Sequence, residues 1–256
     1  LAKRNIRLSS ANSINWGRLV PQIVYYFAAY AQLLKAGQIA LGDAVDFCVP
    51  TGNFGDILAG YYAKQMGLPV GKLVCASNEN NVLTDFLTTG TYTARRAFYK
   101  TTSPSMDILV SSNLERLLYH VTGSDTEVAS LMKQLNETGS YTVRPETLAA
   151  IQESFACGWS SEAQVAEEIR ACYEQDHYLC DTHTAVAFHV AAQHKRDGVP
   201  MVVLSTASPF KFPRSVLEAL GHATPANDFE AMQQLEEATG CTAPASLSAL
   251  RQKAER

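Results

Sequence analysis

The sequence lacks the paired cysteines that mark a disulfide framework or a zinc site. Its six cysteines are scattered, and no two of them form a Cys-x-x-Cys pair; they are Cys48, Cys75, Cys157, Cys172, Cys180 and Cys241. We therefore interpret them as reduced thiols and expect a cytoplasmic protein. No group of His, Cys and Asp residues has the spacing of metal ligands, so no metal site is predicted.

An excess of basic residues is also missing. Lysine and arginine number 21 against 25 acidic residues, and the net charge is −4. This balance argues against a nucleic-acid partner, because nucleic-acid binding relies on cationic contacts to phosphates. With 46% hydrophobic and 18% charged residues, the composition is that of a globular protein rather than a disordered one.

A long uninterrupted apolar run is missing as well. The most apolar stretch, residues 19–34, contains Pro21, Gln22 and Gln32 and is short for a membrane span. A signal-peptide pattern is also absent from the sequence as it stands. These features predict a protein that does not bind a membrane.

What the sequence does contain is an alternation of strand-like and helical patterns. Apolar runs at 45–49 and 72–76 are predicted strands, and helical patterns at 57–66 and 82–87 follow them. This order predicts an α/β fold in which helices cover both faces of a parallel sheet. The run at 199–204 is so apolar that we expect it to be a central, buried strand.

The chain divides into three parts by composition. Residues 1–124 are predicted to form part of a large domain. Residues 125–176 carry more charge and mostly helical patterns, which predicts a helical insertion or subdomain. Residues 177–256 are expected to return to the large domain and to end in a helical tail.

The most informative stretch is the Gly-flanked turn between the strand at 45–49 and the helix at 57–66. It reads Pro50-Thr51-Gly52-Asn53-Phe54-Gly55-Asp56. Such a turn directs several backbone N–H groups, with the positive end of the helix behind them, at one point where a phosphate can bind. The alternative is a plain turn in which glycines only relieve steric clashes. The motif is neither GxGxxG nor a P-loop, so it indicates neither a dinucleotide nor a nucleoside triphosphate.

A hydroxyl cluster, Ser205-Thr206-Ala207-Ser208, follows the strand predicted at 199–204. Ligands of parallel α/β sheets bind outside the carboxyl ends of the strands, so this cluster and the Gly52 turn are expected to share one crevice. The alternative is a simple turn before Pro209.

A second candidate anion site lies at 12–18, where Ser13 and Asn15 suit helix-capping positions and Arg18 lies one turn inside the helix. A plain helix cap with a surface arginine is the alternative. His183 follows Asp181 at another predicted helix start, where it is either a base or a structural histidine.

Taken together and in order, several stretches resemble the threonine synthase family. They are Asn-Ser-Ile-Asn-Trp-Gly-Arg (12–18), Pro-Thr-Gly-Asn-Phe-Gly-Asp (50–56), Asn-Glu-Asn (78–80), Thr-Ser-Pro-Ser-Met-Asp-Ile (102–108), Ser-Asn-Leu-Glu-Arg-Leu (112–117), Asp-Thr-His-Thr-Ala-Val (181–186) and Ser-Thr-Ala-Ser-Pro-Phe-Lys-Phe (205–212). The resemblance implies the large domain of a fold type II pyridoxal-phosphate (PLP) enzyme. It also implies the conversion of O-phospho-L-homoserine and water to L-threonine and phosphate.

The resemblance further implies roles for particular residues. The residues expected around the phosphate of the pyridoxal 5'-phosphate cofactor are Gly52, Asn53, Phe54, Gly55 and Asp56. Thr206 would hydrogen-bond the pyridine nitrogen. The substrate phosphate is expected to be bound by Ser13, Asn15 and Arg18. His183 is also expected to bind the substrate.

One part of the family pattern is missing. The Phe-Lys-Asp segment that carries the Schiff-base lysine is absent, and Phe210-Lys211 belongs to a different motif. We therefore assign no catalytic residue in this chain, and expect that an N-terminal domain is missing and that the chain alone is inactive. The cut edge is expected to expose apolar surface, in a monomer or homodimer. The alternatives are a threonine-synthase-like phospho-lyase, a non-catalytic paralogue without the lysine, and a serine or threonine dehydratase, which needs no second phosphate site.

Overall fold

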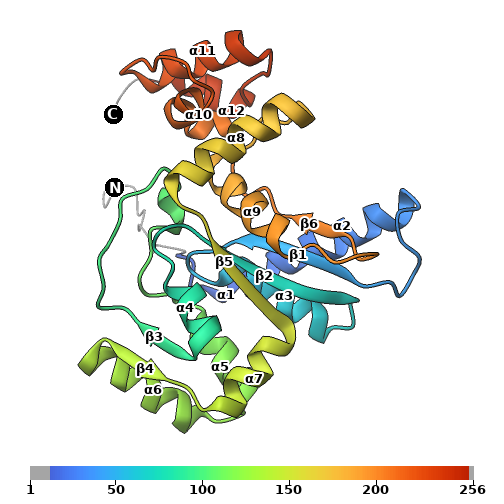
Figure 1. Cartoon of the computed structure of the whole chain (residues 1–256), viewed down its shortest axis with the longest axis vertical. Coiled ribbons are helices and arrows are strands. Elements are labelled where there is room, and N and C mark those ends of the chain that lie inside the picture. The colour runs from blue at the N-terminus through green and yellow to red at the C-terminus, as the bar shows by residue number, and fades with distance from the viewer. Residues whose placement is uncertain (1–11, 254–256) are drawn as a thin grey trace, which may run out of the picture.

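A four-stranded parallel sheet forms the centre of the computed structural model, which describes residues 12–253 (Figure 1). Its strand order is β5-β2-β1-β6. The four strands are β1 (Val45–Pro50), β2 (Val70–Ser77), β5 (Phe155–Trp159) and β6 (Met201–Val203). A separate antiparallel pair consists of β3 (Thr91–Thr93) and β4 (Ser140–Thr142).

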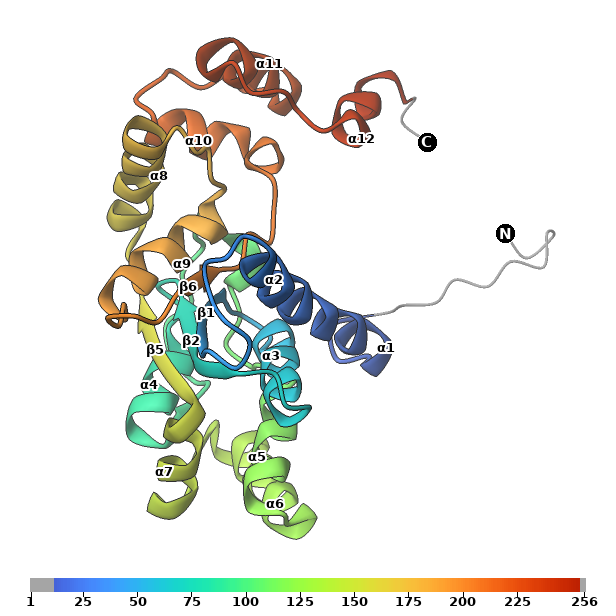
Figure 2. The same ribbon diagram turned by 90° about the vertical axis from the view of Figure 1, so that its right-hand side faces the viewer.

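Helices account for most of the remaining described chain. The α-helices are α1 (Trp16–Leu19), α2 (Ile23–Lys35), α3 (Gly55–Gln65), α4 (Val82–Thr89), α5 (Leu114–Thr122), α6 (Asp125–Thr138), α7 (Pro145–Ser154), α8 (Glu162–Asp176), α9 (Thr182–Gln193), α10 (Pro213–Ala219), α11 (Asp228–Thr239) and α12 (Ala245–Ser248). The 3-10 turns are η2 (Val20–Gln22), η3 (Pro104–Met106), η4 (Pro209–Lys211) and η5 (Ala249–Gln252). Figure 2 shows α8 and α10–α12 gathered at one end of the molecule and α5–α7 at the other.

The two faces of the sheet are buried in two separate hydrophobic cores. Along β1, Phe47 packs into the core that also holds Tyr26 of α2 and Ile57 of α3. Its neighbour Cys48 packs into the other core, together with Val186 of α9. Successive side chains of a strand point to opposite faces, so β1, buried along its whole length, needs apolar residues at nearly every position. The predicted α/β class, with a parallel sheet covered on both faces, is confirmed.

The expectation of a central, buried strand at 199–204 is wrong. Among the described residues β6 pairs only with β1, and its three residues are half-buried at the edge of the sheet. Val202 packs against one core and Val203 against the other. The run is apolar because helices cover both of its faces. An edge strand of a parallel sheet is covered in this way just as a central strand is.

The segment 125–176, expected to be a helical insertion or subdomain, contains two strands, β4 and β5, besides its helices. The predicted helices correspond to α6, α7 and α8, but residues 155–159 between them pair in parallel with β2. This strand is hard to recognise in the sequence because it is short, contains Ala156 and Gly158, and follows α7 without a break. The boundaries of the three predicted parts stay predictions.

Pro21 lies in η2, which separates α1 from α2. Within residues 12–253, helices long and apolar enough to cross a bilayer are absent.

Candidate functional site

A cavity of about 160 Å³ lies at the carboxyl end of β1. It is lined by Gln22, Pro50, Thr51, Gly52, Asn53, Phe54, Gly55, Asp56, Ile57, Ser105, Met106, His183 and Thr206. The structure thus brings the predicted turn, Thr206 and His183 together, although they come from three distant parts of the sequence. We refer to residues 52–56 as the 52–56 turn.

The backbone of the 52–56 turn explains its two glycines. The backbone of Phe54 has a φ of 64°, in the left-handed region that residues other than glycine rarely adopt. Its buried ring packs on Phe155. A Cβ on Gly52 would lie 2.9 Å from the carbonyl oxygen of Ser105. A Cβ on Gly55 would lie 2.7 Å from Oδ1 of Asn53, the atom that accepts a hydrogen bond from the Gly55 amide. A Cβ on Gly52 would therefore clash with backbone atoms, whereas one on Gly55 would displace the side chain of Asn53.

The 52–56 turn presents amide donors that have no acceptor. In the described part of the chain, no atom accepts a hydrogen bond from the backbone N–H of Asn53, Phe54 or Asp56. The last of these belongs to the first turn of α3, an 11-residue helix whose amino end carries partial positive charge. Unsatisfied amides that converge at a helix start form an anion-binding site.

A carboxyl group borders these donors. Burial raises the pKa of Asp56 to about 6, and the hydroxyl of Tyr26 opposes this rise by hydrogen bonding to Asp56 Oδ1. The same hydroxyl donates to the backbone oxygen of Asp56 at 2.7 Å, which anchors the start of α3 to α2. Below about pH 6 the carboxyl group is neutral and no longer repels an anion in the turn.

The carbonyl groups of the 52–56 turn are held from behind. Asn113, buried before α5, donates its backbone N–H and its Nδ2 to the oxygen of Asn53, both at 3.1 Å. The hydroxyl of Ser111 donates to the oxygen of Gly52 at 2.5 Å. With their carbonyls fixed, the peptide units of the turn point their N–H groups toward the cavity. The sequence analysis missed this role of Asn113, although the 112–117 motif contains it.

His183 is buried, and both of its ring nitrogens contact other groups of the chain. Nε2 accepts a hydrogen bond from the amide of Ser105 at 3.2 Å, and Nδ1 lies 3.1 Å from Oδ1 of Asp181. An accepting Nε2 requires the proton on Nδ1. Burial alone would raise the pKa of Asp181, but hydrogen bonds from His183 and Thr184 lower it overall. His183 therefore holds the Ser105 segment against the cavity.

Thr206 reaches the cavity from the loop after β6. The structure places its hydroxyl near no hydrogen-bonding partner in the part of the chain that it describes. An exposed hydroxyl at the carboxyl end of a strand is available to a ligand atom. Thr206 thus supplies a neutral donor or acceptor opposite the 52–56 turn.

The other predicted substrate residues do not line this cavity. Asn15 caps α1, a helix of only four residues, by accepting a hydrogen bond from Gly17. The carbonyl of Ser13 accepts from Nδ2 of Asn113, the residue that also supports the 52–56 turn. Arg18 is exposed and lies four residues before Gln22, which does line the cavity. The 12–18 segment is therefore tied to the site by Asn113 without entering it.

The cavity also includes residues that the sequence analysis did not assign to a site, among them Ser105, Met106 and Gln22. Ser105 and Met106 lie in η3, inside the 102–108 motif, and Gln22 ends η2. For metals, the described residues contain no group of three or more His, Cys, Asp or Glu side chains that could hold an ion.

The fold and the donor-lined turn define the class of the protein as that of the fold type II pyridoxal-phosphate enzymes. A solved structure of PLP-bound threonine synthase from Brucella melitensis superimposes with a TM-score of 0.79 at 44% identity, over 88% of this chain and 48% of the other. The chain belongs to the threonine synthase family.

Sequence comparisons agree. The family model "Threonine synthase, C-terminal" matches residues 184–256. Threonine synthase-like 1 of Pongo abelii is 45% identical over 215 residues, 83% of this chain and 29% of the relative. Threonine synthase of Methylobacillus glycogenes is 40% identical over 225 residues, 86% of this chain and 46% of the relative. The chain thus spans less than half the length of these relatives.

Proposed function

We propose that this chain carries the cofactor-binding part of a threonine synthase, which converts O-phospho-L-homoserine and water to L-threonine and phosphate. The observation that supports this most strongly is the cavity that joins the unsatisfied amides of the 52–56 turn to the hydroxyl of Thr206. A phosphate and a heterocyclic nitrogen are the two polar ends of pyridoxal phosphate. The residues present therefore fit the cofactor.

Each side chain has a distinct role in this proposal. The N–H groups of Asn53, Phe54 and Asp56 bind the cofactor phosphate, and Gly52 and Gly55 leave out the Cβ atoms that would crowd Ser105 and Asn53. The hydroxyl of Thr206 hydrogen-bonds the ring nitrogen as a neutral partner. The bound cofactor would supply an electron sink for carbanion chemistry at the substrate.

The substrate site is proposed at the neighbouring segment. Ser13, Asn15 and Arg18 bind the substrate phosphate, and the link from Ser13 through Asn113 to Asn53 holds the two phosphate sites next to each other. His183 contributes to the substrate side of the cavity by positioning Ser105. The family's Phe-Lys-Asp segment is absent from this sequence, so we expect no phosphate release from phosphohomoserine by this polypeptide alone.

Equilibrium binding of pyridoxal phosphate tests the cofactor proposal. We expect Gly55→Ala and Thr206→Val each to weaken binding by about tenfold, the size of one or two lost polar contacts. Thr138→Val, on the exposed surface of α6, is the matched control and should bind as the original chain does. Equal affinity in all four proteins would overturn the proposal.

The phospho-lyase alternative differs in product. In an active enzyme that contains this chain, a threonine synthase releases L-threonine, whereas a phospho-lyase releases a keto acid. Product analysis by mass spectrometry distinguishes the two.

A further inference from the structure

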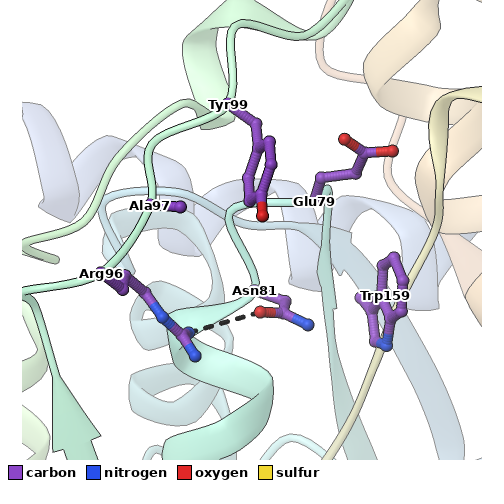
Figure 3. A pocket seen from close by; sticks show the side chains of 6 residues that line it. All are labelled: Glu79, Asn81, Arg96, Ala97, Tyr99 and Trp159. Atoms are coloured by element: carbon purple, nitrogen blue, oxygen red, sulfur yellow. Dashed lines mark hydrogen bonds between the residues drawn. The ribbon is translucent and has the colours of Figure 1, made fainter.

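A second and larger cavity, of about 540 Å³, lies at the carboxyl ends of β2 and β5. It is lined by Glu79, Asn81, Arg96, Ala97, Tyr99 and Trp159, which Figure 3 shows arranged around one open space. None of these residues lines the cofactor cavity, and the volume is within the range of small-molecule sites. The proposed function makes no use of this cavity.

The walls of the second cavity are fixed by the fold. The backbone of Tyr99 is held by two hydrogen bonds to the side chain of Asn80, at 3.0 and 2.8 Å. Trp159 is the last residue of β5 and pairs with Ser77 of β2. Arg96 is held by an ion pair with Asp85. A ligand would therefore find these groups already in place, which reduces the entropic cost of binding.

Polar groups in the cavity have unused hydrogen-bonding capacity. Arg96 donates to Asp85 and, at 3.3 Å, to Oδ1 of Asn81, which leaves three of its five N–H donors. Within residues 12–253, no atom accepts from Nδ2 of Asn81. Glu79 accepts from the amide of Glu162 through Oε1 at 3.2 Å, and its other carboxylate oxygen has no donor among the described residues. Donors thus lie on one side of the cavity and an acceptor on the other.

Two large aromatic side chains stand at the opening. Tyr99 is 49% exposed and Trp159 is 43% exposed, although both belong to rigid parts of the fold. Figure 3 shows the carboxylate of Glu79 beside the ring of Tyr99 and above that of Trp159, on the side of the cavity away from Arg96. Aromatic faces beside a carboxylate attract a cationic ammonium group.

We propose that this second cavity binds a free α-amino acid. Its ammonium group would pair with Glu79 beside Tyr99 and Trp159, and its carboxylate would accept from Arg96 and from Nδ2 of Asn81. The local charge is negative, because two carboxylates, those of Glu79 and Asp85, face one guanidinium, that of Arg96. This disfavours a phosphate or another purely anionic ligand. The proposal is independent of the cofactor site.

Tryptophan fluorescence provides a direct test. The chain has two tryptophans, so Trp16→Phe leaves Trp159 as the single reporter in the cavity. In a buffer without cofactor, this variant is titrated with each non-aromatic proteinogenic amino acid up to about 10 mM. We expect saturable binding of at least one amino acid. N-acetylation or amidation of that amino acid should weaken binding about tenfold or more, because each removes one charge.

Glu79→Gln in the same background keeps the acceptor for Glu162 and removes only the charge, so the start of α8 is preserved. It should weaken binding about tenfold or more, whereas Glu137→Gln, on exposed α6, should not. Absence of any saturable signal, or equal binding by the Glu79 and Glu137 variants, would overturn the proposal. Gly55→Ala should leave amino-acid binding unchanged, so failure here is distinguishable from failure of the cofactor proposal.

Discussion

The 52–56 turn and the 12–18 segment share a sequence pattern, a helix start rich in polar residues and glycine, but their structures differ. The first opens an 11-residue helix behind a buried strand, with amides that have no acceptor in the described chain. The second opens a helix of four residues on the surface, where Asn15 already caps the amide of Gly17.

This difference shows what an anion site needs beyond a helix start. The 52–56 turn has donors without an acceptor in the described chain, a long helix behind them and a cavity that Thr206 also lines. In the 12–18 segment the capping donor is satisfied locally, so this segment depends on the side chains of Ser13 and Arg18 to bind an anion.

Asp56→Asn should stabilise the protein by about 3 kcal/mol at pH 8, because the native carboxyl group is buried and has a pKa of about 6. In the unfolded chain the pKa of this carboxyl group is about 4. Between about pH 4 and about pH 6 the folded chain therefore binds a proton on Asp56 that the unfolded chain has lost. The original chain therefore loses stability as the pH rises from about 4 to about 6, and the variant does not. Urea unfolding at pH 8 and pH 4 measures this; an equal gain at both pH values would contradict it.

Gly52→Ala should weaken the binding of pyridoxal phosphate by about 30-fold, or about 2 kcal/mol, because the new Cβ would meet the Ser105 carbonyl at 2.9 Å. Gly17→Ala is the matched change in the 12–18 segment, where the nearest atom is a side-chain oxygen at 3.2 Å. It should leave cofactor binding unchanged. Isothermal titration calorimetry compares the two, and similar losses in both variants would remove the distinction between the sites.

Asn113→Ala should destabilise the protein by about 1.5 kcal/mol, because it removes the Nδ2 donor shared by Ser13 and Asn53. Its own backbone N–H still holds Asn53, so the 52–56 turn keeps part of its support. Pyridoxal phosphate binding should fall by less than in Gly52→Ala. Thermal unfolding and calorimetry test this; unchanged stability would show that the two regions are not coupled through Asn113.

Asn15→Ala should cost only about 0.5 kcal/mol, the low end for an N-cap, because α1 is short and exposed. The change is small enough that a series of urea unfolding curves is needed to resolve it. Asp181→Ala, the cap of buried α9, is the comparison and should cost clearly more. A larger loss at Asn15 than at Asp181 would contradict the difference in burial.

The sequence was sufficient to predict the parts of the site that depend on local backbone chemistry. Gly52 and Gly55 occupy the two positions of the turn where a Cβ would be crowded, and Thr206 follows a strand of the same sheet. The α/β class followed from the alternation of strands and helices. These features depend on a few residues in a row, so a single sequence contains them.

Features that depend on distant contacts could not be predicted in this way. β5 is a strand because β2 lies beside it, and its own residues are weak strand formers. The edge position of β6 likewise depends on which strands it pairs with, as its composition is that of a central strand. Asn113 supports Asn53 across 60 positions of sequence, and Glu79 and Trp159 meet only through the pairing of β2 with β5.

We propose above that the amides of the 52–56 turn, which have no acceptor in the described chain, bind a phosphate group. Backbone amide NMR shifts measured as pyridoxal phosphate is added test this directly, with inorganic phosphate as the second probe. We expect saturable shifts that are largest at the amides of Asn53, Phe54 and Asp56 for both probes. Shifts that centre on residues 15–18, or none at the turn at saturation, would contradict it.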